Sequence, residues 1–185
     1  MGLRKRIGLI KSLALNSRDS TVHQQFLNIR GARLDDANSI IDIDIKCFET
    51  AWSPEEWSAI GQKPGHAISV ATNYGNVVGF AVFRHDSANT AIEVVKIAVK
   101  EKYRRQLISV QLLLAGAEYA HARFSQYLYI VVPESTIYPG EKNVSNWLKA
   151  VGFEAKNFIK KHFNAYGDTE DGVRFVHPLK KKDIT

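Results

Sequence analysis

The sequence lacks the residues and runs that mark several classes of protein. It has a single cysteine, Cys47, among 185 residues, so no internal disulfide can form, and we expect a reducing, cytoplasmic setting. No Cys/His cluster has the spacing of a structural zinc site, so we expect no metal. No apolar run approaches the ~20 residues that a membrane-spanning helix needs. The longest candidate, residues 127–132, is bounded by Gln126 and Pro133, which excludes a transmembrane role and a membrane partner.

The composition is that of one globular domain with a core, because 45% of the residues are hydrophobic and 24% are charged. The net charge of +6 lies at the N-terminus, where residues 1–33 contain seven basic residues and one acidic residue. We therefore expect a basic N-terminal extension over residues 1–26 and a folded domain over residues 27–185. Such an extension either is solvated or contacts nucleic acid, the ribosome or an acidic partner.

Hydrophobic periodicity predicts elements in the order β-α-α-β-β-β-α-β-α-β-β. We expect strands over residues 27–34, 67–72, 77–84, 91–99, 127–132, 153–163 and 173–176. We expect helices from residue 35 or 36 to residue 47, from 54 to about 60, over 108–124 and over 143–151. Asp35 or Asp36 is suited to cap the first helix. This order predicts an α+β fold with a mixed central sheet flanked by helices.

Three local signals support these elements. Ser53 and Glu56 have the spacing of a capping box at the start of the second helix. The sequence Asn73-Tyr74-Gly75-Asn76 predicts a tight turn between two antiparallel strands, with a positive φ at Gly75. The apolar run over residues 127–132 follows a helix, which is typical of a buried strand that pairs in parallel after a crossover.

Four segments carry a resemblance to a known family. They are residues 47–57, with Phe48, Trp52 and Ser53; residues 77–82, with a glycine before an apolar run; residues 97–106; and residues 146–153, ending in Gly-Phe. In this order and spacing they resemble the GNAT superfamily of acetyl-CoA-dependent N-acetyltransferases. The first segment resembles the branch that acetylates the N-terminal alanine of a ribosomal protein. The resemblance covers roughly residues 27–179.

The resemblance implies a loop that binds the pyrophosphate of acetyl-CoA through backbone N–H groups at a helix N-terminus. The family pattern is Arg/Gln-x-x-Gly-x-Gly/Ala, and the matching span here is Arg104, Arg105, Gln106, Leu107, Ile108 and Ser109. Leu107 has a Cβ where the backbone approaches a phosphate, and it resists a positive φ. Ser109 is a milder change. Arg104 and Arg105 either pair with phosphate or are solvated turn charges.

The resemblance also implies roles in cofactor binding and acyl transfer. The backbone of Ile97, Ala98 and Val99 would pair with the pantetheine. The reaction needs a base for the ammonium and an acid for the leaving thiolate. Glu93 matches the base of the histone-acetylating branch; the alternative is a carboxylate that faces solvent or forms an ion pair.

The acid has no direct counterpart, because Trp147 occupies the position of the tyrosine in the ribosomal-protein branch. Tyr138 and His162 are candidates, with rim packing and an exposed strand end as their alternatives. Trp52, Trp57 and Trp147 are candidate substrate contacts or packing residues. We expect Asp42, Asp44 and Glu49 to form a solvated helix face; the alternative is that this acidity near the acceptor opening attracts a cationic amine.

Three functions remain open. The first is an acetyl-CoA-dependent N-acetyltransferase, an acyltransferase that acts on a primary amine at a protein or peptide N-terminus or on a lysine. The second is a catalytically inactive binding module of the same fold, which Leu107, Ser109 and Trp147 would explain. The third is an acetyltransferase that acts on nucleic acid or a modified base, with the basic extension as its anchor.

Overall fold

The computed structural model describes residues 27–138, 144–165 and 168–179, so the expected basic extension lies outside the described residues. Strands β1 to β7 cover Leu27–Gly31, His66–Asn73, Asn76–Asp86, Ala91–Val99, Tyr127–Pro133, Glu154–Ala165 and Asp168–Pro178. Helices α3 to α6 cover Ala37–Cys47, Pro54–Gln62, Ile108–Ala122 and Val144–Ala150. Short 3-10 turns η1 to η4 cover Leu34–Asp36, Ser87–Asn89, Glu101–Tyr103 and Glu134–Thr136. The predicted order of helices and strands and the α+β class are confirmed.

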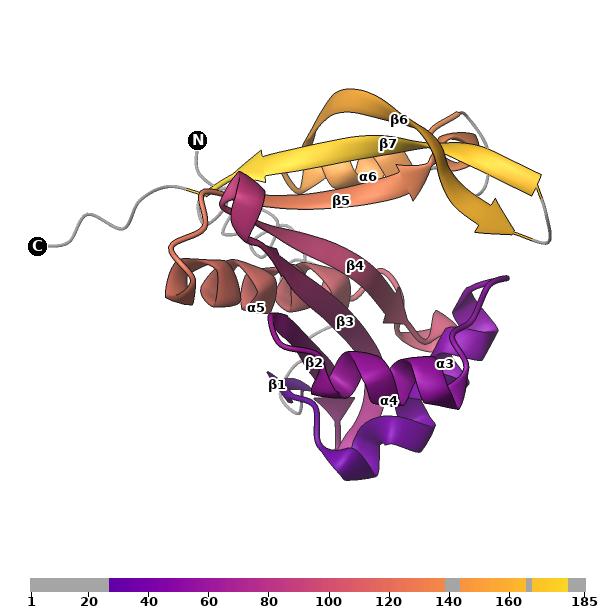
Figure 1. Cartoon of the computed structure of the whole chain (residues 1–185). Helices are drawn as coiled ribbons and strands as arrows, with labels where there is room; N and C mark the ends of the chain where they lie inside the picture. Colours follow the sequence, from indigo (N-terminus) through magenta and orange to yellow (C-terminus); the bar gives the residue numbers. More distant parts are fainter. Residues whose placement is uncertain (1–26, 139–143, 166–167, 180–185) are drawn as a thin grey trace, which may run out of the picture.

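The strands form one seven-stranded sheet in the order β1-β2-β3-β4-β5-β7-β6. Neighbouring strands are antiparallel except β4 and β5, which are parallel and are joined through α5. The prediction of a mixed sheet with a buried parallel strand after a crossover is therefore confirmed. Because β7 lies between β5 and β6, the final hairpin extends the sheet on the far side of β5 (Figure 1).

The two parallel strands pair over a short stretch only. Ala91–Glu93 of β4 face Tyr127–Tyr129 of β5, and the strands then diverge (Figure 1). From Val94 to Val99, β4 pairs with β3 alone among the described strands. The register with β3 shifts between Val82 and Phe83, which leaves Val95 as a bulge residue. A bulge increases local twist and re-aims the side chains that follow it.

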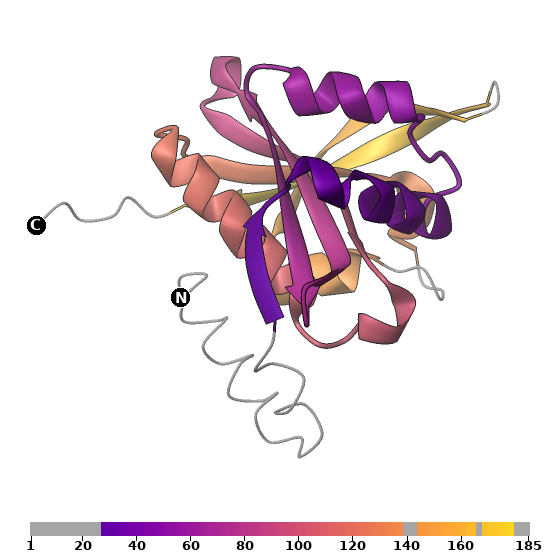
Figure 2. The same cartoon turned by 90° about the horizontal axis from the view of Figure 1, so that it is seen from below.

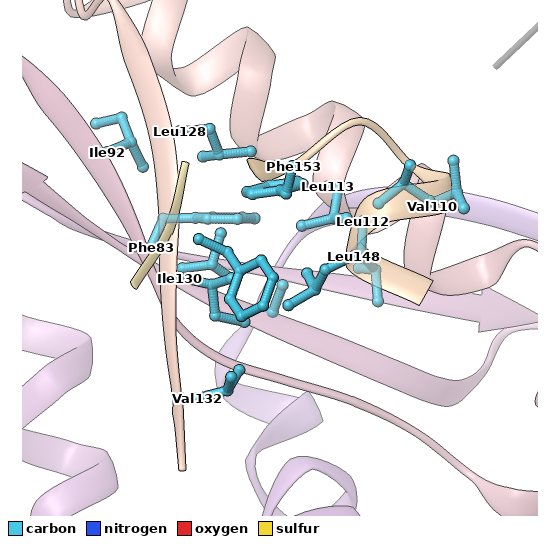
Figure 3. Packing of buried hydrophobic residues seen from close by; sticks show 14 of the residues in the cluster. Phe83, Ile92, Val110, Leu112, Leu113, Leu128, Ile130, Val132, Leu148 and Phe153 are labelled. Carbon is cyan, nitrogen blue, oxygen red and sulfur yellow. The ribbon is translucent and has the colours of Figure 1, made fainter. Parts of the chain in front are cut away.

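Helices cover both faces of the sheet (Figures 1 and 2). The larger core lies between the sheet and helices α5 and α6, and it includes Phe83, Ile92, Leu112, Leu128, Leu148 and Phe153 (Figure 3). The smaller core lies between the sheet and helices α3 and α4, and it includes Ile40, Ile43, Trp57, Val70, Phe80 and Val82. Burying each such large side chain contributes roughly 1.5–3 kcal/mol. The two cores pack on the two faces of the sheet, and the diverging strands β4 and β5 lie between them.

Helix α5 lies unusually close to the sheet at Gly116. A Cβ at this position would lie 2.4 Å from the ring of Phe83, which is fully buried. The glycine therefore allows the crossover helix to approach β3 closely. This approach fixes where α5 begins relative to the end of β4.

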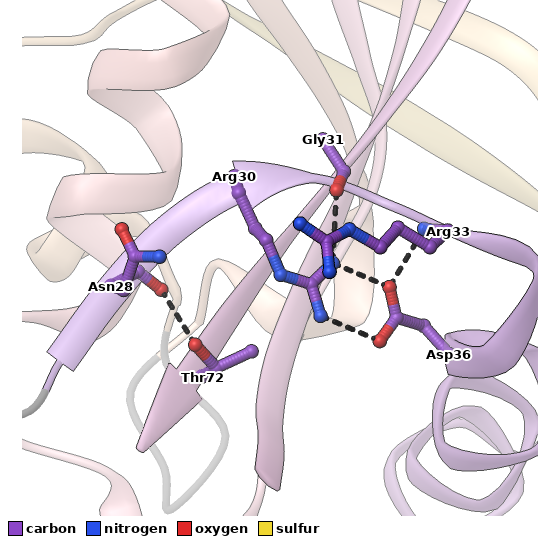
Figure 4. Close-up of polar contacts among 6 residues, drawn as sticks. All are labelled: Asn28, Arg30, Gly31, Arg33, Asp36 and Thr72. Carbon is purple, nitrogen blue, oxygen red and sulfur yellow. Dashed lines mark hydrogen bonds and ion pairs between the residues drawn. The ribbon is translucent and has the colours of Figure 1, made fainter. Parts of the chain in front are cut away.

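The connection from β1 to α3 differs from the expectation. The first strand ends at Gly31, and neither Asp35 nor Asp36 caps α3 through its side chain. Instead Asp36 accepts hydrogen bonds from the Arg30 guanidinium at 2.6 and 2.8 Å and from the Arg33 backbone N–H at 2.7 Å (Figure 4). The Arg30 side chain holds the pKa of Asp36 below its usual value. Asp36 thus closes the turn before the helix.

Two other local predictions are confirmed. The Ser53 hydroxyl accepts from the Glu56 N–H at 3.2 Å, and the Glu56 carboxylate accepts from the Ser53 N–H at 2.7 Å. The turn between β2 and β3 has two residues, Tyr74 and Gly75, with φ values of 49° and 80°. Two positive φ values in a two-residue turn match the right-handed twist of the flanking strands.

Candidate functional site

Glu93 lies where β4 and β5 part. Ile92 and Val94 both belong to the larger core, so Glu93 between them points to the face that carries α3 and α4. Its side chain is buried, with 7% of the residue exposed. Arg84, its cross-strand neighbour on β3, forms an ion pair with its Oε2. Of the alternatives from the sequence, the solvent-facing carboxylate is excluded, and the ion pair is present.

Tyr129 lies beside Glu93 in the parallel register of β5. Its hydroxyl donates to Oδ2 of Asp86 at 3.1 Å. Burial, together with the negative charges of Glu93 and Asp86, raises the pKa of Tyr129 to about 12. The hydroxyl is therefore protonated at neutral pH, and it is held in one orientation. The sequence gives no signal for a functional role of Tyr129, because this residue lies inside an apolar strand run.

The loop before α5 has the backbone conformation that an anion-binding loop requires. Arg105 and Leu107 have φ values of 63° and 61°, and Leu107 precedes the first residue of α5. Leu107 thus adopts the positive φ that it was expected to resist, at a cost of about 1–2 kcal/mol. The first intrahelical bond runs from the Gln111 N–H to the Leu107 carbonyl, so the N–H groups of the three residues between them have no partner within the helix.

Two side chains of this loop are also placed by the structure. The Leu107 side chain packs against the larger core. Arg104 donates from Nε to the Val99 carbonyl at 3.2 Å and from a terminal nitrogen to Cys47 Sγ at 3.6 Å. Arg104 is exposed, and through these two contacts it ties the loop to the end of β4. The Arg105 side chain is exposed, which leaves it available to an anion at the loop.

A buried ion pair lies between α3 and β4. Asp44 has no exposed surface, and its Oδ1 lies 2.6 Å from Lys96 Nζ. Its Oδ2 accepts from the Trp52 backbone N–H at 2.9 Å and from Trp57 Nε1 at 3.0 Å. The prediction of a solvated helix face is therefore wrong for Asp44. The bulge at Val95 is the reason, because strict alternation would have pointed Lys96 away from α3.

Aromatic rings enclose the ammonium of Lys96. Its Nζ lies 4.7 Å from the centre of the Phe48 ring and 4.4 Å from the centre of the Trp52 ring. Burial lowers the pKa of Lys96. Trp57 is buried and stacks edge-on against Phe80, with ring centres 5.2 Å apart. The segment between α3 and α4 is thereby fixed on β4, beside the point where the sheet opens.

The three other predicted site residues lie on the later elements. Tyr138 is exposed and donates its hydroxyl to Glu134 at 2.8 Å, which raises its pKa. His162 lies on an exposed part of β6, with its ring centre 4.8 Å from that of Phe163. Trp147 of α6 is half-buried against the larger core. Within the described ranges, no hydrogen bond or ion pair joins these residues to Glu93, so their proposed roles stay predictions.

Two kinds of site are absent from the described part of the chain. No group of three or more His, Cys, Asp or Glu side chains is placed there to hold a metal ion. No described helix combines the length and the apolar character needed to cross a membrane.

Comparison with known proteins gives a match to one family and to several solved structures. Residues 37–138, more than half of the chain, match the sequence profile of the acetyltransferase (GNAT) family. These residues run from the start of α3 through the segment after β5, so they include Glu93 and the loop before α5. No curated protein sequence matches the chain.

Solved structures share the fold at low sequence identity. The ribosomal-protein-S18-alanine N-acetyltransferase from Escherichia coli matches with a TM-score of 0.69 and 17% identity, over 86% of this chain and 97% of that chain. Ard1 from Thermoplasma volcanium matches with a TM-score of 0.72 and 17% identity, over 84% and 99%. NAA60 from Arabidopsis thaliana, in complex with a bisubstrate analogue, matches with a TM-score of 0.70 and 13% identity, over 84% and 99%. At these identities the likeness concerns the fold alone.

Proposed function

Since this chain belongs to the acetyltransferase (GNAT) family, we propose that it transfers an acetyl group from acetyl-CoA to a primary amine. The acceptor is a protein or peptide N-terminus or a lysine, and the free thiol of Cys47 fits a cytoplasmic setting. The observation that carries the proposal is the buried carboxylate of Glu93 at the point where β4 and β5 separate. The similar structures support the acceptor class, because one of them is named for acetylating an alanine of a ribosomal protein.

The residues present fit acetyl-CoA. The backbone N–H groups from Arg105 to Ser109 would hold the pyrophosphate, since positive φ at Arg105 and Leu107 shapes the loop and α5 adds its N-terminal dipole. The Arg104 N–H is already donated to the Glu101 carbonyl. The open edge of β4 would pair with the pantetheine through the backbone of Ile97, because Ala98 has the same orientation as Lys100, whose N–H donates to Val78 of β3. The Val99 carbonyl, on the same edge as Ile97, already accepts from Arg104. When bound, acetyl-CoA supplies the thioester carbonyl that an amine attacks.

Glu93 acts as the general base in this proposal. Its carboxylate accepts a proton from the acceptor ammonium, directly or through one water molecule, and leaves the amine with a free electron pair. Arg84 holds the carboxylate in place through the ion pair. Tyr138 and His162 stay the candidates for returning a proton to the leaving sulfur. Trp52, which is half-buried, would line the acceptor side in the segment fixed by Asp44, while Trp57 is buried in the smaller core and has a packing role.

A thermal-shift titration with acetyl-CoA tests the proposal. At about 100 times the dissociation constant, a bound ligand raises the free energy of unfolding by about 2.7 kcal/mol. We expect this stabilisation, together with release of free CoA thiol when an amine acceptor is added. No shift at millimolar acetyl-CoA would favour the inactive binding module. RNA binding that weakens steeply with salt, and is lost when residues 1–26 are deleted, would favour the nucleic-acid acceptor instead.

The loop conformation gives a second expected result. Leu107→Val is expected to raise the Kd for acetyl-CoA about fivefold to tenfold, because a β-branched residue tolerates positive φ poorly. Tenfold corresponds to about 1.4 kcal/mol, which lies within the usual penalty for the left-handed region. Leu107→Gly is the matched control and is expected to bind more tightly than Leu107→Val, since glycine adopts this φ freely. Isothermal titration calorimetry measures both; equal Kd values would show that φ at residue 107 does not govern binding.

A further inference from the structure

Arg174 of β7 lies on the same face of the sheet as Glu93 of β4, and both strands are neighbours of β5. Its neighbours Val173 and Phe175 both belong to the larger core, so Arg174 points away from α5. It pairs with Val131 of β5, while Glu93 pairs with Tyr129 of the same strand. Successive residues on one strand face are roughly 7 Å apart. Arg174 therefore lies near the point where β4 and β5 begin to separate, and β5 lies between it and Glu93.

The guanidinium of Arg174 has no acidic partner among the described residues. The guanidinium stacks on the ring of Tyr129, with 4.7 Å between its carbon and the ring centre. Its Nε is buried and has no hydrogen-bond partner. A buried N–H left without an acceptor costs about 1–3 kcal/mol. Other arginines of the sheet are paired: Arg30 binds Asp36, and Arg84 binds Glu93.

The two nearby carboxylates do not satisfy Arg174. Glu93 is paired with Arg84, and Asp86 accepts from Asn89 at 2.8 Å and from the Tyr129 hydroxyl at 3.1 Å. The second contact also fixes the Tyr129 ring on which the guanidinium stacks. Arg174 thus stacks on a ring that is anchored by a hydrogen bond of its hydroxyl, while the buried Nε–H of Arg174 lacks an acceptor among the described residues. A pre-positioned guanidinium of this kind binds a carboxylate in a two-point contact.

We propose that Arg174 binds a carboxylate of the acceptor, so that the preferred acceptor is an amine that carries an acidic group nearby. This inference rests on the proposed acetyl transfer and narrows its substrate class. Glu93 takes the proton of the ammonium, and Arg174 holds the carboxylate on the other side of Tyr129. The carboxylate comes either from an acidic side chain next to a peptide N-terminus or from the α-carboxylate of a free amino acid.

Matched acceptor pairs test the inference. One pair is a tetrapeptide amide that begins Ala-Glu and its counterpart that begins Ala-Gln; the other is free alanine and alaninamide. We expect kcat/KM to be at least tenfold higher for the carboxylate member of one pair, mainly through KM. A preference in the peptide pair identifies the side chain as the source, and a preference in the alanine pair identifies the α-carboxylate. In Arg174→Gln the ratio within that pair is expected to fall to about one.

The matched control is Arg123→Gln. Arg123 also stacks on a tyrosine, 5.2 Å from the ring centre of Tyr119, but it lies beyond the end of α5, away from Glu93. It is expected to keep the carboxylate preference of the native chain. Circular dichroism and a thermal melt establish that both variants are folded, and Arg174→Lys, which keeps the charge, is expected to restore part of the preference. Equal kcat/KM within both pairs overturns this inference alone, whereas no transfer to any acceptor overturns the proposed function with it.

Discussion

Glu93→Gln is expected to lower kcat by about two to four orders of magnitude, which is the usual contribution of a general base. The amide has nearly the same shape as the carboxylate but cannot accept the proton of the acceptor ammonium. The fold should survive, because the ion pair that is lost has a half-exposed partner: 50% of the Arg84 side chain is accessible. The rate of thiol release from acetyl-CoA at saturating acceptor measures the effect.

Two measurements separate a lost base from a damaged site. The stabilisation of Glu93→Gln by acetyl-CoA should match that of the native chain, because the residues proposed to hold the pyrophosphate lie in a different segment, from Arg105 to Ser109. Arg84→Gln removes the same ion pair but keeps the carboxylate, so its kcat should fall far less. If Glu93→Gln turns over within about threefold of the native rate, the amine must lose its proton to another group or to water, and Glu93 has only the ion-pair role.

The fold was largely predictable because its signals are local. The strand over Ala91–Val99 and the start of α5 at Ile108 agree with the predicted bounds, since a β-rich run and a change of period mark them in the sequence. The capping box at Ser53 depends on residues three apart, and it formed as predicted. The first strand was predicted too long, because the turn after Gly31 is stabilised by the bond between Arg30 and Asp36, which the sequence pattern does not reveal.

The site was only partly predictable, for reasons that lie in the tertiary structure. The position of Glu93 on β4 followed from the resemblance, but its ion pair with Arg84 depends on cross-strand register. The bulge at Val95 shifts the alternation of β4, so no periodic pattern could indicate that Lys96 faces α3. Arg174 became visible only when β7 was placed beside β5, a neighbour that is distant in sequence. A search for charged residues inside otherwise apolar strands would have identified both Lys96 and Arg174.

For Leu107 the sequence predicted an obstacle to positive φ that the structure overcomes. The sequence suggested that a leucine at this position would resist the left-handed conformation, because only glycine adopts it without cost. The structure places the leucine side chain against the larger core, which offsets part of that cost. Packing therefore allows a backbone conformation that local preference disfavours. A departure from a family pattern at one position does not by itself remove the loop geometry.

Asp44→Asn is expected to lower the free energy of unfolding by about 3–5 kcal/mol, the usual cost of breaking a buried ion pair by removing one partner. The asparagine can still accept from Trp57 Nε1, but the charge of Lys96 is left without its counterion under the rings of Phe48 and Trp52. Urea denaturation at neutral pH measures the change. A loss this large is a substantial part of the total stability of a domain, which is about 5–15 kcal/mol.

We expect the loss of stability in Asp44→Asn to come from the burial of the ion pair and not from its distance. A second ion pair, also on α3, provides the control. Asp42 and Lys46 are also 2.6 Å apart, but both are solvent-accessible, so Asp42→Asn should leave the urea midpoint nearly unchanged. The double variant with Asp44→Asn and Lys96→Met should be more stable than Asp44→Asn alone, because methionine removes the stranded charge and packs well between aromatic rings. If Asp44→Asn and Asp42→Asn cost the same, water reaches the Asp44–Lys96 pair, and the segment between α3 and α4 is held by its tryptophans alone.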